Sequence, residues 1–238
     1  MLYFFTMQIF YTPQIATSCE LPDEEAAHCV RVLRLTEGAE VLLTDGQGSF
    51  YRAVLTQAHP KHCTFEIVEQ WQPAPLWNFH LHIAIAPTKN IDRTEWFVEK
   101  ATEIGIDAIT CLNCRFSERK EVKPARLEKI LISAMKQSQK ATLPQLEGMV
   151  GFTEFVRRPF EGRKFIAHCE EGEKPLLQHA CRPGENALVL IGPEGDFSSE
   201  EIRLAQACGF EPISLGPSRL RTETAALVAC HTIHIINS

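Results

Sequence analysis

The segment LIGPEGDFSSEEI, residues 190–202, joins an apolar run to a polar stretch through two glycines and a proline. The apolar run predicts a buried strand, and the capping-box spacing of Ser198 and Glu201 predicts a helix directly after the loop. Such glycine turns often hold phosphate, because helix N-termini attract anions. Here Glu194 and Asp196 would repel a phosphate, and the GxxxxGK[ST] and GxGxxG motifs are absent. The loop therefore suits a neutral or cationic ligand held by backbone groups.

A second glycine turn follows in SLGPSRLRTETAAL, residues 214–227. Because the two turns end consecutive strands, we expect them to form two walls of one slot. Arg219 and Arg221 enter beside that slot, and Thr222 is expected to cap the closing helix. A cation at a helix N-terminus opposes the helix dipole, so we interpret Arg221 as functional rather than as an exposed surface charge.

The flanking sequence predicts two domains. Residues 1–73 contain short alternating strands, a hairpin signal at Asp45-Gly46 and one short helix, which together predict a small β-barrel. Two prolines in WQPAPLW mark the boundary. Residues 74–238 alternate strands with helices, which predicts an α/β domain with a mostly parallel sheet covered on both faces.

Helix ends can be placed in the second domain. One helix is predicted to begin at Asp92, with Glu95 at capping-box spacing, and to end at Gly105. Another begins with Pro124 in its first turn and keeps a 3.6-residue apolar period. TETAALVACHTIHII, residues 222–236, is the last predicted helix.

Composition limits the class of protein. No apolar run reaches the roughly 18–20 residues of a membrane helix. The start, MLYFFTMQIF, lacks a basic region and a cleavage site, so we do not interpret it as a signal peptide; Met7 is an alternative start, with residues 1–6 a short extra strand or an artefact. Nine scattered cysteines favour reduced thiols and a cytoplasmic protein.

Cys111 and Cys114 form a CxxC motif that has no second copy in the chain. A zinc site completed by His80 or His82 is one interpretation, but the spacing is weak. Buried cysteines near a strand end are the preferred interpretation, and we predict no metal.

Positive charge is concentrated in residues 111–145, which hold eight basic and three acidic residues in a chain of net charge −6. A positive island on an acidic chain suits a polyanion such as RNA; a solvated helix face is the alternative. Residues 1–73 hold four basic and nine acidic residues, an awkward balance for an RNA platform, although Arg31, Arg34 and Arg52 can still form a local patch.

The two glycine turns, IGPEGDFSSEEI and LGPSRLRTETAAL, together resemble the RsmE family of 16S ribosomal RNA uridine-N3 methyltransferases, in the SPOUT superfamily. The resemblance covers essentially the whole chain. HCVRVLRLTEGAEVLLTDGQG is similar to the PUA-like N-terminal domain of that family. KNIDRTEWFVEKATEIGIDAI and RLEKILISAMKQSQKATLPQL resemble helical regions of its catalytic domain.

This resemblance implies a SPOUT-type parallel sheet with a C-terminal trefoil knot, and a homodimer. It implies S-adenosylmethionine as methyl donor and 16S ribosomal RNA or the small ribosomal subunit as partner, with no membrane. The donor is a sulfonium without phosphate, which is compatible with an acidic loop. The candidate cofactor-binding residues are Leu190, Gly192, Pro193, Glu194, Gly195, Leu215, Gly216, Leu220 and His168.

Catalytic roles follow from the chemistry of uridine N3, which must lose its proton before methylation. Arg221 is expected to stabilise negative charge on a uracil carbonyl oxygen. Glu223 is a candidate for the base that accepts the proton; solvent is the alternative, as is a structural role for Glu223. The candidate RNA-binding residues are Arg31, Arg34, Arg115, Arg119, Lys136 and Lys140.

The sequence departs from the family pattern in both turns. Asp196 stands where the family commonly has glycine, and Ser218 and Arg219 occupy positions where an arginine and an aliphatic residue are usual. Three other functions remain open: a superfamily relative that methylates a ribose 2′-hydroxyl or another base, a noncatalytic RNA-binding assembly factor, and a nucleotide-dependent oxidoreductase. The missing dinucleotide motif disfavours the last of these.

Overall fold

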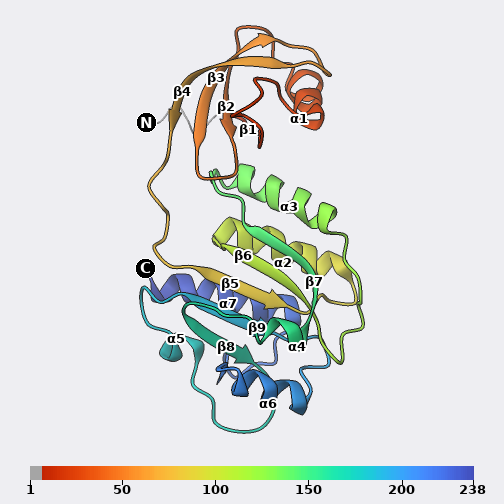
Figure 1. Cartoon of the computed structure of the whole chain (residues 1–238), viewed down its shortest axis with the longest axis vertical. Coiled ribbons are helices and arrows are strands. Elements are labelled where there is room, and N and C mark those ends of the chain that lie inside the picture. Colours follow the sequence, from red (N-terminus) through yellow and green to blue (C-terminus); the bar gives the residue numbers. More distant parts are fainter. Residues whose placement is uncertain (1–6) are drawn as a thin grey trace. The chain divides into compact units, whose positions relative to one another are not determined.

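The computed structural model describes residues 7–238, so the extra strand considered for residues 1–6 lies outside the described part (Figure 1). The chain divides into two compact units. One consists of Met1–Pro75 and Ile132–Leu143, and the other of Leu76–Leu131 and Pro144–Ser238. The last turns of helix α3 (Pro124–Gln137) therefore group with the N-terminal unit, which the sequence did not predict.

The N-terminal unit contains a four-stranded sheet in the order β1-β2-β3-β4. Its strands are β1 (Ile9–Tyr11), β2 (Glu40–Thr44), β3 (Phe50–Gln57) and β4 (Thr64–Trp71). Strand β1 pairs with β2 in parallel, and the other pairs are antiparallel.

The predicted barrel is only partly closed in the described residues. β1 is three residues long, and only a single bridge, between Glu20 and Thr64, joins the chain after it to β4. This bridge consists of two backbone hydrogen bonds, one of 2.8 Å from the amide of Leu21 to Cys63 and one of 3.0 Å from the amide of Phe65 to Cys19. Helix α1 (Asp23–Ala27) and the π-helical turn η2 (His28–Val32) contribute Ala26 and Cys29 to the core of this unit.

The second unit is built on a six-stranded parallel sheet in the order β10-β8-β9-β5-β6-β7. This confirms the predicted α/β class. The strands are β5 (Leu81–Ile85), β6 (Ala108–Asn113), β7 (Gln145–Gly151), β8 (Arg163–Ala167), β9 (Ala187–Ile191) and β10 (Glu211–Ile213).

Helices cover both faces of this sheet, as predicted. Helices α2 (Ile91–Ile104) and α7 (Thr222–Ile236) pack together, and α7 lies against β5 and β9 (Figure 1). The other face is covered by α4 (Phe152–Phe155) and α6 (Ser199–Ala207), which share a buried cluster with Leu188 and Leu190 of β9. A short helix, α5 (Leu177–Ala180), contacts α7. Among residues 7–238, no helix has the length and apolar character that crossing a bilayer requires.

The helix ends test the capping predictions. Helix α6 has the predicted capping box of Ser198 and Glu201. Helix α2 ends at Gly105 as predicted, but its N-cap is Asn90, whose side chain accepts a hydrogen bond from the backbone amide of Asp92. The predicted cap at Asp92 is therefore wrong by two residues. The side-chain oxygen of Asn90 accepts the hydrogen bond from a free backbone amide of the first turn, so Asn90 is the N-cap.

Helix α7 has the predicted bounds, but the predicted cap at Thr222 is wrong. Thr222 is the first helical residue, and Arg221 occupies the N-cap position without a side-chain capping bond. The extended backbone of Arg221 leaves its side chain free to point away from the helix start.

Candidate active site

The six strands of the second sheet are parallel, so their carboxyl ends lie at the same edge. Five loops leave the sheet at this edge, after β5, β6, β8, β9 and β10, and α4 follows β7 directly. The glycine turns after β9 and β10 belong to this edge. Strand β8 lies between β9 and β10, so the loop after β8 separates the two turns. That the two turns form two walls of one slot stays a prediction, with the loop after β8 lying between them.

A cavity of about 510 Å³ lies at this edge. It is lined by His168 and Cys169 of the loop after β8, and by Leu215, Gly216 and Leu220 of the turn after β10. Its volume falls in the range of roughly 300–1,000 Å³ that small-molecule sites occupy. The structure thus brings together four of the predicted cofactor-binding residues, namely His168, Leu215, Gly216 and Leu220.

Gly216 is required by its backbone conformation. Its φ is +124°, and a Cβ atom built there would meet no heavy atom within 4 Å. Other residues rarely adopt this backbone geometry, so glycine is needed even though space is available. Lys174 and Ala225 also line the cavity, and no motif in the sequence indicated either, because neither belongs to a glycine turn.

The turn after β9 does not line this cavity. Leu190 is fully buried in the core, and Cβ atoms built on Gly192 and Gly195 would lie 3.1 Å from the ring of Phe197 and 3.3 Å from Cβ of Phe116. The absence of a side chain at these two glycines therefore leaves room for Phe197 and Phe116 to pack against the turn. That Leu190, Gly192, Pro193, Glu194 and Gly195 contact the methyl donor stays a prediction.

The two carboxylates of the glycine turn hold neighbouring loops together. Glu194 Oε1 accepts a 2.9 Å hydrogen bond from the backbone amide of Lys89, in the loop after β5. Asp196 Oδ2 accepts one of 2.7 Å from the backbone amide of Cys169, in the loop after β8. Because β9 lies between β8 and β5, its loop reaches both neighbours.

Asp196 adopts a left-handed backbone conformation, with φ of +67°. Aspartate tolerates this region better than most residues, because its short side chain bonds locally. Here Oδ1 also accepts a 2.8 Å hydrogen bond from the backbone amide of Phe197. Asp196 thus adopts the backbone conformation that glycine would allow, and its side chain adds a hydrogen bond to the backbone amide of Cys169.

His168 presents two buried ring nitrogens, and neither has a hydrogen-bond partner within residues 7–238. The pKa of His168 is lowered, first by burial and then by the cation of Lys174. The ring is therefore neutral near pH 7, with one donor and one acceptor available to a ligand in the cavity.

Arg221 and Glu223, the two predicted catalytic residues, differ in exposure. Arg221 is exposed, and within residues 7–238 its guanidinium makes no hydrogen bond or ion pair. Glu223 is 7% exposed and does not line the cavity. Its Oε1 lies 4.0 Å from Nε of Arg93 on α2, and its Oε2 has no partner in the described residues.

Several predicted RNA-binding residues are engaged inside the protein. Arg119 donates to the backbone carbonyls of Thr88 at 3.0 Å and Lys89 at 2.6 Å. Lys136 forms a 2.6 Å ion pair with Glu25. Lys140 is only 9% exposed, and its contact with RNA stays a prediction.

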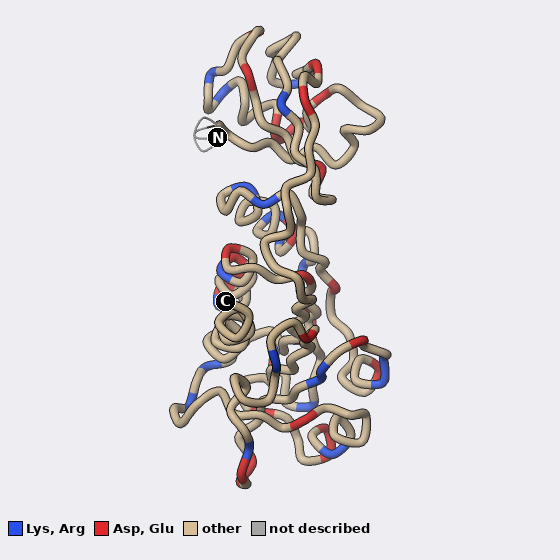
Figure 2. Tube along the Cα trace, turned by 90° about the vertical axis from the view of Figure 1, so that its left-hand side faces the viewer, with Lys and Arg blue, Asp and Glu red and all other residues tan. Residues whose placement is uncertain are grey.

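Arg31, Arg34 and Arg115 are exposed. Arg115 Nη1 lies 3.3 Å from Glu200 in an ion pair whose two side chains remain more than half exposed. Figure 2 shows basic and acidic residues interspersed along the second unit.

Cys111 and Cys114 are buried, and burial raises the pKa of Cys111 to about 12. His82 Nε2 lies 2.9 Å from the hydroxyl of Thr110. In the described part of the chain no group of three potential metal ligands is assembled.

Both units of the chain match known protein families. Residues 21–68 match the RNA methyltransferase PUA domain, and residues 75–234 match the RNA methyltransferase domain. The chain belongs to this RNA methyltransferase family.

Its relatives include a ribosomal RNA small subunit methyltransferase E of Synechocystis, 30% identical over 93% of this chain and 74% of the relative. A solved structure of a probable rRNA-methyltransferase from Porphyromonas gingivalis is 43% identical and has a TM-score of 0.92, covering 97% of this chain and 98% of the other. A ribosomal RNA small subunit methyltransferase E from Neisseria gonorrhoeae, bound to S-adenosyl methionine, is 27% identical with a TM-score of 0.82 and the same coverage. The chain is thus similar over nearly its whole length to RNA methyltransferases.

Proposed function

We propose that this methyltransferase uses S-adenosylmethionine to methylate N3 of one uridine in 16S ribosomal RNA. The cavity of about 510 Å³ at the carboxyl edge of the sheet carries the proposal, because four predicted donor-binding residues line it. The relative from Neisseria gonorrhoeae, which is bound to S-adenosyl methionine, supports the choice of donor.

The cavity residues fit this donor. Leu215 and Leu220 offer apolar surface for the adenine ring, and the open space at Gly216 allows a close approach to the backbone. The unpartnered nitrogens of His168 can exchange hydrogen bonds with the donor, and the ammonium of Lys174 suits its carboxylate.

The donor supplies an electrophilic methyl group for in-line displacement by N3. Arg221 directly follows Leu220, the last residue of the turn that lines the cavity; Arg219 is a lining residue and Arg221 is not. The exposed guanidinium of Arg221 can stabilise the negative charge that develops on a uracil oxygen. Because Glu223 is only 7% exposed and its Oε1 lies 4.0 Å from Arg93, we assign it a positioning role at the start of α7 and assign the N3 proton to solvent.

We further propose that the C-terminal segment forms the trefoil knot of the SPOUT superfamily. Strand β10 is at the edge of the sheet, yet α7, which follows it, packs on the central strands β5 and β9. The chain must therefore return across the loops after β8 and β9, a path that a knot would require.

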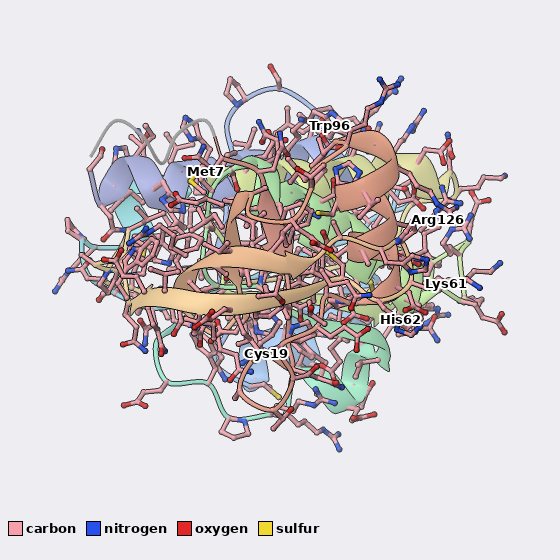
Figure 3. All side chains as sticks on the ribbon, turned by 90° about the horizontal axis from the view of Figure 1, so that it is seen from above. Met7, Cys19, Lys61, His62, Trp96 and Arg126 are labelled. Atoms are coloured by element: carbon pink, nitrogen blue, oxygen red, sulfur yellow. The ribbon has the colours of Figure 1, made fainter. Side chains whose placement is uncertain are left out.

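A cytoplasmic homodimer with domains at residues 1–73 and 74–238 completes the proposal. The matched family regions end at residue 68 and begin at residue 75, which supports the boundary. Trp96 of α2, labelled in Figure 3, is 42% exposed, and Ile235 of α7 is 58% exposed. Apolar side chains on two packed helices suit an interface between two copies.

Methyl transfer to ribosomal subunits tests this function. Small subunits from a strain lacking the modification would be incubated with the protein and labelled S-adenosylmethionine, and the nucleosides would be identified by mass spectrometry. We expect 3-methyluridine. A 2′-O-methylated product would assign the chain to another activity of the superfamily, and donor and RNA binding without methyl transfer would support the assembly-factor alternative.

A further inference from the structure

Phe116 is a large apolar side chain that remains 49% exposed at the loop edge of the second sheet. The other exposed large hydrophobic residues of this unit are Leu76, at its start, and Trp96 and Ile235 on helices. Phe116 instead follows β6, where the functional loops meet. The half-exposed phenyl ring therefore offers an apolar face to a ligand at this edge of the sheet.

The loop that carries Phe116 is held rigidly. The backbone amide of Arg115 donates a 2.8 Å hydrogen bond to Glu201 of α6. Ser117 accepts one of 3.0 Å from the backbone amide of Cys114. On the far side, Arg119 binds two backbone carbonyls of the loop after β5. The ring is therefore presented in one place, and a partner that stacks on it would lose little binding energy to ordering.

Phe116 also contacts the glycine turn after β9. A Cβ atom on Gly195 would lie 3.3 Å from Cβ of Phe116. The next residue, Asp196, binds the backbone amide of Cys169, which lines the proposed donor cavity. The exposed ring is thus linked through two adjacent residues to the wall of that cavity.

A cation accompanies the ring. The guanidinium of Arg115 lies 5.7 Å from the centre of the Phe116 ring, and the Arg115 side chain is 61% exposed. An aromatic face beside an exposed arginine combines a stacking surface for a base with a contact for a phosphate. RNA-binding proteins recognise unstacked bases with such surfaces.

We propose that Phe116 is a stacking platform for an unpaired RNA base at the methylation site, with Arg115 contacting the adjoining phosphate. This inference rests on the proposed function and adds an RNA-contacting residue to it. A target uridine must leave its stacked neighbours to reach a methyl donor, and a platform at the same edge of the sheet as the cavity would hold the displaced base or a base near it.

The test compares binding of two fluorescein-labelled probes, hexauridylate and an abasic hexamer with the same ribose-phosphate chain. We expect the wild-type protein to bind hexauridylate about tenfold more tightly, the lower part of the range for one base–aromatic stack. Phe116→Leu, which keeps apolar volume but lacks a π face, should lose this preference. Phe116→Tyr should keep it, because the tyrosine ring retains a π face.

Equal affinity of the wild type for both probes, or an unchanged preference in Phe116→Leu, would overturn the inference. So would a loss of dimerisation in Phe116→Leu during analytical ultracentrifugation, because it would assign the ring to an interface with a second copy. Methyl transfer by the wild type to small subunits, measured over a range of subunit concentrations, tests the proposed function separately. In that assay Phe116→Leu should raise KM for the subunits and leave the affinity for S-adenosylmethionine unchanged.

Discussion

The carboxylate of Asp196 accepts a 2.7 Å hydrogen bond from the backbone amide of Cys169 and so joins the glycine turn after β9 to the cavity wall after β8. Asp196→Ala should lower the free energy of unfolding by about 2–3 kcal/mol, since it loses this bond and places alanine at a positive φ. Asp196→Gly loses the bond without backbone strain, so we expect about 1–2 kcal/mol. Urea unfolding measures both values.

The same variants also test positioning of the cavity wall. Asp196→Asn keeps an oxygen acceptor and tolerates the backbone conformation, so it should retain most of the stability and the affinity for S-adenosylmethionine. The alanine and glycine variants should both bind the donor more weakly. If Asp196→Gly bound S-adenosylmethionine with wild-type affinity, the hydrogen bond between Asp196 and Cys169 would not be needed to position the cavity wall.

Arg221→Ala should lower kcat by about 100-fold, because a single donor to a developing oxyanion contributes on this scale. Affinity for S-adenosylmethionine should change little. Arg203→Ala, which removes an exposed arginine on α6, is the matched control and should have normal turnover. Near-normal turnover in Arg221→Ala would exclude the proposed catalytic role.

Glu223→Gln separates a positioning role from proton transfer. A positioning role predicts a reduced kcat whose pH dependence matches the wild type, because the proton still passes to solvent. If Glu223 were the base, its removal would abolish the acidic limb of the pH–rate profile along with most of the activity. Methyl-transfer rates from pH 5 to 9 distinguish the two outcomes.

His82 should make stability pH-dependent. Burial, assisted by the neighbouring His80, lowers the pKa of His82 to about 4 in the folded protein. The unfolded chain then binds the proton more readily, so the stabilising contribution is complete above about pH 6.5 and is lost as pH falls towards 4.

Between pH 7 and pH 5 this one group should cost about 2 kcal/mol of unfolding free energy. His82→Gln does not titrate and keeps a side chain able to hydrogen-bond to Thr110, so it is the reference. Urea unfolding at both pH values should show a smaller acid loss in the variant. Equal losses in the two proteins would contradict the pKa assignment.

Local signals predicted those features that depend on adjacent residues. The capping box of Ser198 and Glu201 and the bounds of α7 both follow from short sequence patterns, and the structure has them. The glycine turn after β10 and the strand-end position of His168 were recognised in the sequence, and the family resemblance implied that Leu215, Gly216 and Leu220 bind the donor; these four residues line one cavity.

Features that depend on strand order could not be read from the sequence. The partner of Glu194 is Lys89, 105 residues away, and that of Asp196 is Cys169. Nothing local indicates that β8 lies between β9 and β10, nor that Gly195 faces Phe116. The burial of Lys140 was missed for the same reason, because tertiary packing rather than charge pattern decides it.

Calorimetric titration with S-adenosylmethionine tests the central claim most directly, with NADH as a control ligand. Ala225→Phe fills the cavity from α7, and Ala207→Phe places the same side chain at an exposed position on α6. We predict that the wild type and Ala207→Phe bind one donor per chain, that Ala225→Phe binds it at least about tenfold more weakly, and that NADH does not bind. Equal donor affinity in all three proteins would contradict the assignment of this cavity, and absence of binding in the wild type would contradict the donor itself.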